Sequence, residues 1–286
     1  MNMQRKSIRI LDGPVLSYLE GGTGRPLLML HGWSQSATGF SGQFEKLCET
    51  RHVIALDWRG HGESEKPETG YRICRFAKDL VEFLDALSLT DFDVLCHSLG
   101  ASVIWAYLSM FGKERPPQKV IFIDEPAALL ARPDWNEQVQ REAGAIIASL
   151  EILANFTNSI RNADTVAAHA EILRPMFTNS FPEEKLFAVA KENLKFPRSH
   201  AAVLLADNCL QDWRSVVGEI DKEVLVVAAE ASPHPLDSQI WIANQIKGAE
   251  LEIFAETEGG SHFMFLENPD RFNFVLNGFL NRPGRG

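Results

Sequence analysis

A serine and a histidine of this sequence have the surroundings that nucleophilic catalysis requires. Ser98 lies in VLCHSLGAS, residues 94–102, where an apolar run leads into a tight turn and then a helical pattern. A serine at the tip of a strand–turn–helix projects its hydroxyl outward, and the amide of the next residue, Leu99, points into the same space. The pattern predicts a nucleophile; the alternative is that Ser98 only caps the helix.

The residue two positions before Ser98 departs from the usual form of this turn. The motif normally reads G-x-S-x-G, because the backbone and the neighbouring helix are close together there. Here Cys96 replaces the first glycine and Gly100 supplies the second. Cysteine is small, so we expect the turn to keep its form.

A late histidine is the candidate base. His262 follows Gly259-Gly260-Ser261, directly before a helical pattern. Glycines let the loop present the imidazole toward Ser98, and a serine-to-histidine order along the chain is typical of such sites. The alternative is a surface histidine without a catalytic role.

A second turn supplies a candidate partner for the Leu99 amide. LLMLHGW, residues 27–33, is an apolar strand that runs into His31, Gly32 and Trp33. We assign the second oxyanion donor to the Trp33 amide, because two such donors stabilise the charge that develops on a carbonyl oxygen. We expect His31 to be hydrogen-bonded behind the turn.

The elements that must position these residues follow an α/β pattern. Short apolar runs, expected where both faces of a strand are buried, alternate with longer segments of helical period, among them 75–87 and 101–111. This alternation predicts a mainly parallel sheet covered by helices. The expected strands are 7–11, 15–19, 26–30, 52–57, 93–96, 119–124, 223–228 and 250–254.

The strand pattern is interrupted between residues 125 and 213. This segment contains only helical stretches, near 142–154, 165–176 and 201–210, separated by loops. We predict a helical cap at 125–213, inserted into a core domain that consists of residues 1–124 and 214–286.

The motifs together resemble those of the α/β-hydrolase superfamily over nearly the whole chain. HGW, DWRGHGES (57–64), CHSLGAS (96–102) and GGSHFMFLENPDRF (259–272) occur there in this order and at this spacing. The resemblance implies an α/β-hydrolase fold, with a mostly parallel eight-stranded sheet, flanking helices and a cap.

The position of the acid departs from that family pattern. The usual aspartate follows the strand written here VLVVAA, but this sequence has AEASP, residues 229–233, with Ser232 at the expected place. Some members, including lactonases that resemble zearalenone hydrolase and cofactor-free 3-hydroxy-4-oxoquinoline dioxygenases, carry the acid after the strand that precedes the cap. Asp124 lies there. We favour Asp124 over Glu230, with Glu125 and Asp237 as further alternatives.

Three functions are compatible with these residues. The leading hypothesis is a serine hydrolase that cleaves an ester or lactone of a small hydrophobic molecule through an acyl-enzyme. The alternatives are a cofactor-independent 2,4-dioxygenase of a 3-hydroxy-4-oxoquinoline-type substrate, in which Ser98 only positions the substrate, and a non-catalytic receptor. The residues assigned to substrate binding are His31, His97, Trp135, Phe156, Phe177 and Phe181.

Composition narrows the classes of partner. The 286 residues carry a net charge of −10 without a run of basic residues, which argues against nucleic acids and anionic membranes. The four cysteines are widely spaced, and no apolar run approaches the ~18 residues of a membrane span. We expect a cytoplasmic protein without metal or organic cofactor; a homodimer is compatible with the sequence.

Overall fold

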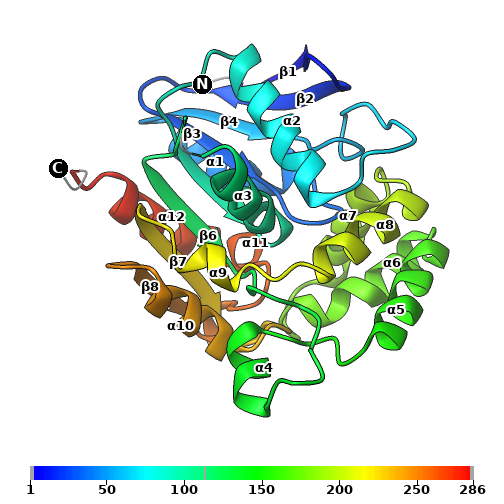
Figure 1. Ribbon diagram of the computed structural model, residues 1–286. Helices are drawn as coiled ribbons and strands as arrows, with labels where there is room; N and C mark the ends of the chain where they lie inside the picture. Colours follow the sequence, from blue (N-terminus) through cyan, green and yellow to red (C-terminus); the bar gives the residue numbers. More distant parts are fainter. Residues whose placement is uncertain (1–2, 113, 284–286) are drawn as a thin grey trace.

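The computed structural model describes residues 3–112 and 114–283, and its centre is a single eight-stranded sheet (Figure 1). The strand order is β1-β2-β4-β3-β5-β6-β7-β8, in which β1 and β2 are antiparallel to their neighbours and the remaining pairs are parallel. The strands are β1 (Gln4–Arg9), β2 (Val15–Gly21), β3 (Pro26–Leu30), β4 (His52–Leu56), β5 (Asp93–His97), β6 (Lys119–Ile123), β7 (Glu223–Ala229) and β8 (Glu250–Phe254). The predicted eight-stranded, mostly parallel sheet is confirmed.

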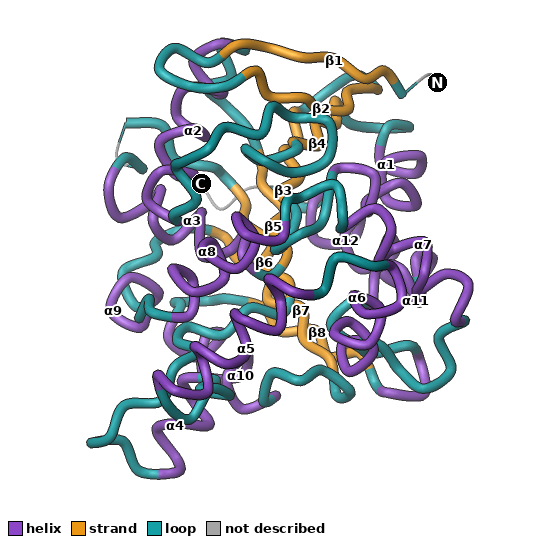
Figure 2. The backbone as a smooth tube through the Cα atoms, turned by 90° about the vertical axis from the view of Figure 1, so that its right-hand side faces the viewer, coloured by secondary structure: helices purple, strands orange, loops and turns teal. Residues whose placement is uncertain are grey.

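Helices cover both faces of this sheet (Figure 2). One apolar cluster joins the sheet to α2 (Ile73–Ala86), α3 (Leu99–Met110) and α10 (Leu236–Gln245). A second cluster on the opposite face includes α1 (Ser41–Leu47) and α12 (Pro269–Leu280). Strands β5 and β6 are buried at every residue, which explains their almost wholly apolar sequence.

The segment between β6 and β7 forms a group of helices at one end of the sheet (Figure 1). In chain order they are α4 (Glu137–Ala143), α5 (Leu150–Asn162), α6 (Val166–Leu173), the short 3₁₀ helix Arg174–Met176, α7 (Glu183–Asn193), α8 (Arg198–Cys209) and α9 (Arg214–Val217). The division of the chain into a core and a cap domain stays a prediction.

The sequence reading was wrong about the first of these helices. It placed one helix at 142–154, where the structure has the end of α4 and the start of α5. Gly144 ends α4 in the left-handed conformation (φ 83°), and the Ser149 side chain then caps α5 by accepting from the Ile152 amide. Helix α7 was not predicted, and β1 begins at Gln4 instead of residue 7. Among the described residues, none of the helices is long and apolar enough to span a membrane.

Candidate active site

Ser98 lies at the tip of a strained turn between β5 and α3. Its backbone has φ 51° and ψ −130°, a conformation that costs free energy for any residue with a Cβ and that recurs at functional sites. Hydrogen bonds hold the turn: the Ser98 amide donates to the Ile123 carbonyl (2.9 Å), and the Ala101 amide donates to the Ser98 carbonyl (2.7 Å). Cys96 is fully buried, and its thiol donates to the carbonyl of Ile121. The expected form of the turn is therefore present despite the substitution.

Two glycines allow neighbouring backbone to approach this turn closely. A Cβ at Gly100 would lie 2.7 Å from the carbonyl oxygen of Leu30, at the end of β3. A Cβ at Gly32 would lie 2.9 Å from the Cβ of Ser98. Both distances are shorter than van der Waals contact, so the loop after β3 can lie against the serine turn only because these residues lack a side chain.

The two candidate oxyanion donors belong to these adjoining segments. Leu99 is the first residue of α3, where backbone amides have no acceptor within the helix. Trp33 follows Gly32, and no acceptor in the described parts of the chain pairs with its amide. The Trp33 indole donates to the Ala201 carbonyl of α8 (2.8 Å), which fixes the turn against the helices above the sheet.

His262 and Asp124 form a buried hydrogen-bonded pair. The Nδ1 atom of His262 lies 2.7 Å from Oδ2 of Asp124, and the two side chains are 5% and 1% exposed. Because Nδ1 is engaged, Nε2 is the nitrogen left for chemistry in the cavity. Asp124 follows β6 directly, with a left-handed backbone (φ 49°).

Ser232, at the place where the usual acid is missing, supports the displaced one. Its hydroxyl donates to Oδ2 of Asp124 at 2.5 Å. The alternative acids lie elsewhere: Glu230 is exposed and accepts from the Glu256 amide, and Asp237 pairs with Arg141 (2.6 Å).

A second imidazole contacts the same carboxylate. His234 directs Nδ1 at the Asp124 carbonyl (3.0 Å) and lies 3.5 Å from its Oδ2, and its ring stands edge-on to His262. Burial alone would raise the pKa of Asp124, but hydrogen bonds from His234 and His262 outweigh it and hold this pKa below its usual 3.8. Sequence reasoning missed His234; the available signal was its place two residues after Ser232.

The same three residues are the one group among the described residues whose ligand atoms are close enough for a metal ion. Those of Asp124, His234 and His262 lie within 4.8 Å of one another. Oδ2 of Asp124 already accepts hydrogen bonds from Ser232 and His262 at 2.5 and 2.7 Å. We therefore assign these contacts to a hydrogen-bonded network that holds the imidazoles.

Ser98 and His262 line one cavity of about 250 Å³ beneath the helices that follow β6. Most of its wall is apolar, and residues on α5, α6 and α8 contribute to it. Of the residues assigned to substrate binding, His97 and Phe156 line this cavity. His97 is fully buried, its Nε2 lies 2.9 Å from the His262 carbonyl, and burial lowers its pKa well below 6.5.

The other four assignments to substrate binding are corrected by the structure, which places these residues outside the cavity wall. His31 lies behind the turn, as expected from its sequence position, and its ring contacts the Gly32 carbonyl and the Trp58 amide. Trp135 is partly exposed, and Arg214 packs on its ring.

Phe177 and Phe181 are the other two residues whose assignment to substrate binding is corrected. They stack on each other, and Phe177 also stacks on Phe263, with ring centroids 4.3 and 4.6 Å apart. Phe263 lines the cavity, so the two phenylalanines support its wall from behind. Both side chains are buried, but their aromatic type alone could not specify which surface they face.

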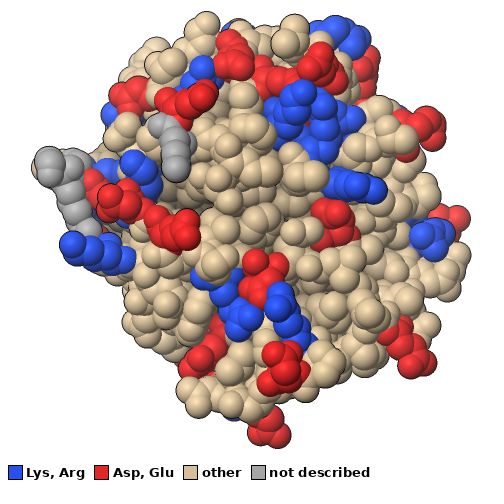
Figure 3. Space-filling view, viewed as in Figure 1, with Lys and Arg blue, Asp and Glu red and all other residues tan. Residues whose placement is uncertain are grey.

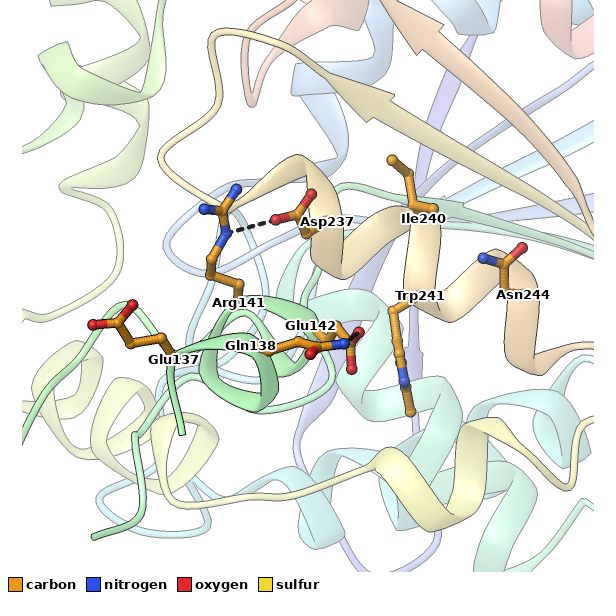
Figure 4. Close-up of a pocket in the computed structure, with 8 residues that line it drawn as sticks. All are labelled: Glu137, Gln138, Arg141, Glu142, Asp237, Ile240, Trp241 and Asn244. Carbon is orange, nitrogen blue, oxygen red and sulfur yellow. Dashed lines mark hydrogen bonds and ion pairs between the residues drawn. The ribbon is translucent and has the colours of Figure 1, made fainter. Parts of the chain in front are cut away.

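Charged residues outside this cavity form local pairs. On the face viewed in Figure 3, acidic and basic side chains lie side by side. A separate open hollow of about 500 Å³ lies between α4 and α10, where Arg141 reaches across to Asp237 (Figure 4). It contains none of Ser98, His262 and Asp124.

Comparisons with known proteins agree with this architecture. The model of the alpha/beta hydrolase family matches residues 27–273. The chain is 31% identical to the non-heme chloroperoxidase CPO-A1 of Kitasatospora aureofaciens, over 95% of this chain and 98% of that protein. Its fold is similar to an esterase from Exiguobacterium antarcticum (TM-score 0.86, 22% identity, 98% of this chain and 100% of that one). It is also similar to the enol-lactonase from Burkholderia xenovorans LB400 (TM-score 0.80, 18% identity, 97% and 100%). The chain is an enzyme that belongs to the alpha/beta hydrolase family.

Proposed function

We propose that this enzyme is a serine hydrolase that cleaves a carboxylic ester or lactone of a small hydrophobic molecule through an acyl-enzyme. The observation that carries the proposal is the shared cavity of Ser98 and His262, with His262 held by the buried carboxylate of Asp124. The largely apolar wall and the modest volume of that cavity support a small hydrophobic substrate.

The proposed reaction uses each group at a defined atom. Nε2 of His262 takes the proton from the Ser98 hydroxyl as Oγ attacks the carbonyl carbon. The amides of Leu99 and Trp33 stabilise the oxyanion, and removal of one such donor typically costs ~3 kcal/mol of barrier. The imidazolium then protonates the leaving alcohol, and a water molecule activated by His262 releases the acid.

The resting position of Ser98 requires one rotation before attack. Its hydroxyl donates to Oε2 of Glu125 at 3.3 Å in this structure. Turning about the Cα–Cβ bond redirects the hydroxyl to the imidazole, as expected for sites whose catalytic hydrogen bonds tighten only when substrate is bound.

The test of the mechanism is Ser98→Ala with p-nitrophenyl butanoate as substrate. Loss of the nucleophile should lower kcat by orders of magnitude, because no other group can form the acyl-enzyme. A variant that keeps more than about a tenth of the wild-type kcat would refute the acyl-enzyme.

The second candidate is a cofactor-free 2,4-dioxygenase of 3-hydroxy-4-oxoquinoline-type substrates. The observation in its favour is the acid after β6, the position that those enzymes share. In this reaction His262 and Asp124 deprotonate the substrate and Ser98 only positions it. Ser98→Ala would then keep much of the activity, and oxygen uptake with a 3-hydroxy-4-oxoquinoline would accompany turnover.

A further inference from the structure

Glu125 is a buried carboxylate inside the candidate catalytic cavity that the proposed mechanism does not use. It follows Asp124 directly, is 2% exposed, and lies in the cavity wall. Among the described residues of that wall it is the one carboxylate, and none is a lysine or an arginine. A buried charge is costly unless it is paired or hydrogen-bonded.

Three donors of the protein point at this carboxylate. Oε1 accepts from the Ser102 hydroxyl (2.8 Å) and from the Asn208 amide of α8 (3.0 Å). Oε2 accepts only the longer hydrogen bond from Ser98 (3.3 Å). Both oxygens therefore accept hydrogen bonds from the protein, but none of the three donors carries a positive charge.

Among the described residues Ser98 is the one donor to Oε2, and catalysis removes it. When the Ser98 hydroxyl turns to His262, Oε2 is left facing the cavity without a partner. His234 also lines the cavity, but its Nδ1 is directed at the Asp124 carbonyl. A substrate group must therefore satisfy Oε2, or the complex loses a hydrogen bond to a buried charge.

We propose that Glu125 binds a hydrogen-bond donor of the substrate close to the reacting carbonyl, and that the preferred substrate is an amino-substituted ester or lactone. This inference rests on the proposed ester hydrolysis at Ser98. A carbonyl carbon poised for attack lies ~3 Å from Oγ. A nitrogen two or three bonds from that carbon can reach Oε2, which lies 3.3 Å from Oγ before the hydroxyl turns to His262. A protonated amine fits best, because no lysine or arginine of the described cavity wall pairs with Glu125.

Two matched series of ethyl esters test this preference. They are CH3–CHX–COOEt and CH3–CHX–CH2–COOEt, with X as methyl, hydroxyl or ammonium, so that shape is kept while the donor changes. In at least one series, the kcat/KM of wild-type enzyme for the ammonium-substituted ester should be about ten or more times that for the methyl-substituted ester, as expected for a charged hydrogen bond. Hydroxyl esters should lie between the two. A wild-type ratio of one or less in both series overturns the inference.

Glu125→Gln keeps the shape of the side chain and removes its charge. Glu125 contacts Ser98, so its substitution can change the absolute rate. The quantity compared is therefore the ratio of kcat/KM for the ammonium-substituted ester to kcat/KM for the methyl-substituted ester. The ratio should fall toward one in Glu125→Gln. It should stay at the wild-type value in the control Asp237→Asn, which removes a carboxylate from the hollow between α4 and α10. An unchanged ratio in Glu125→Gln overturns the inference.

A binding measurement separates this inference from the proposed function. Isothermal titration calorimetry should show that n-butylammonium binds wild-type protein more tightly than butanoate does. The affinity for n-butylammonium should fall about tenfold in Glu125→Gln. Equal or tighter binding of butanoate by the wild type contradicts the role of Glu125, even if the variant does not fold. If no ester is hydrolysed, the proposed function fails, while calorimetry still tests the role of Glu125. If the ethyl esters with X as methyl are hydrolysed and the ammonium group gives no advantage, only the role of Glu125 fails.

Discussion

Replacing Asp124 by asparagine should slow ester hydrolysis by at least a thousandfold while the fold is kept. The carboxylate lies 2.7 Å from Nδ1 of His262, and both side chains are buried, so little solvent screens the imidazolium that forms during attack. Two unit charges ~4 Å apart at an effective dielectric constant of ~20 interact by ~4 kcal/mol. Since ~1.4 kcal/mol corresponds to a factor of ten, this term alone predicts a decrease of about 10³ in kcat.

A second effect of the same substitution acts on the tautomer of the imidazole. The introduced asparagine side chain presents an amide that can donate to Nδ1 and so move the ring proton to Nε2, where His262 could no longer accept the proton of Ser98. Together the two effects predict a loss of up to about 10⁴, the magnitude measured for the equivalent change in another serine hydrolase.

The assay is steady-state hydrolysis of p-nitrophenyl butanoate near neutral pH, with circular dichroism as a check on the fold. Glu230→Gln is the matched control, because Glu230 is exposed and bonds only to the Glu256 amide. We expect its kcat to stay within about twofold of the wild type, as for most surface substitutions. A decrease of less than tenfold in Asp124→Asn, with the fold intact, would refute the assignment of the acid.

Three further changes probe the same network. Ser232→Ala removes the 2.5 Å donor to Oδ2 of Asp124, and kcat should fall about tenfold; no decrease would mean that the hydroxyl does not orient the carboxylate. Gly32→Ala places a Cβ 2.9 Å from the Cβ of Ser98. The kcat of this variant should fall at least tenfold with little change in melting temperature, and full activity would contradict the assigned close approach. Burial lowers the pKa of His234, but the hydrogen bonds to Asp124 and the nearby carboxylate charges together outweigh it and raise the pKa above 6.5. A raised pKa contributes stability that is fully present below pH 6.5 and is lost as the pH rises through the folded value. In urea titrations, the difference in free energy of unfolding between the wild type and His234→Gln should thus be larger at about pH 5.5 than at about pH 9. A difference that does not depend on pH would contradict the raised pKa of His234.

The core of the fold was accessible from the sequence because its strands are buried on both faces. The central residues of β5 (VLC) and β6 (VIFI) are all apolar, so the length and spacing of such runs identify the sheet. Ser98 and His262 were found for a related reason: glycines adjoin both, in turns that follow recognisable strands. The local sequence pattern was therefore sufficient to single out these two residues.

The roles that the sequence did not identify depend on contacts between distant segments. Ser232 was interpreted as the loss of an acid, whereas its hydroxyl binds an acid that is 108 positions earlier in the chain. His234 and Glu125 have ordinary local surroundings, and only the folded sheet brings them to the cavity of Ser98. The assignments of Phe177 and Phe181 to substrate binding failed for the opposite reason, because residue type alone does not distinguish a cavity wall from the support behind it.

Covalent labelling of Ser98 tests the central claim most directly. A fluorophosphonate reacts with a serine only when an adjacent base and an oxyanion site activate it. The enzyme should take up one probe per chain by intact mass, peptide mapping should place the adduct on Ser98, and Ser98→Ala should remain unlabelled. A wild-type protein that hydrolyses esters without forming this adduct, or an adduct that persists in Ser98→Ala, would contradict Ser98 as the nucleophile.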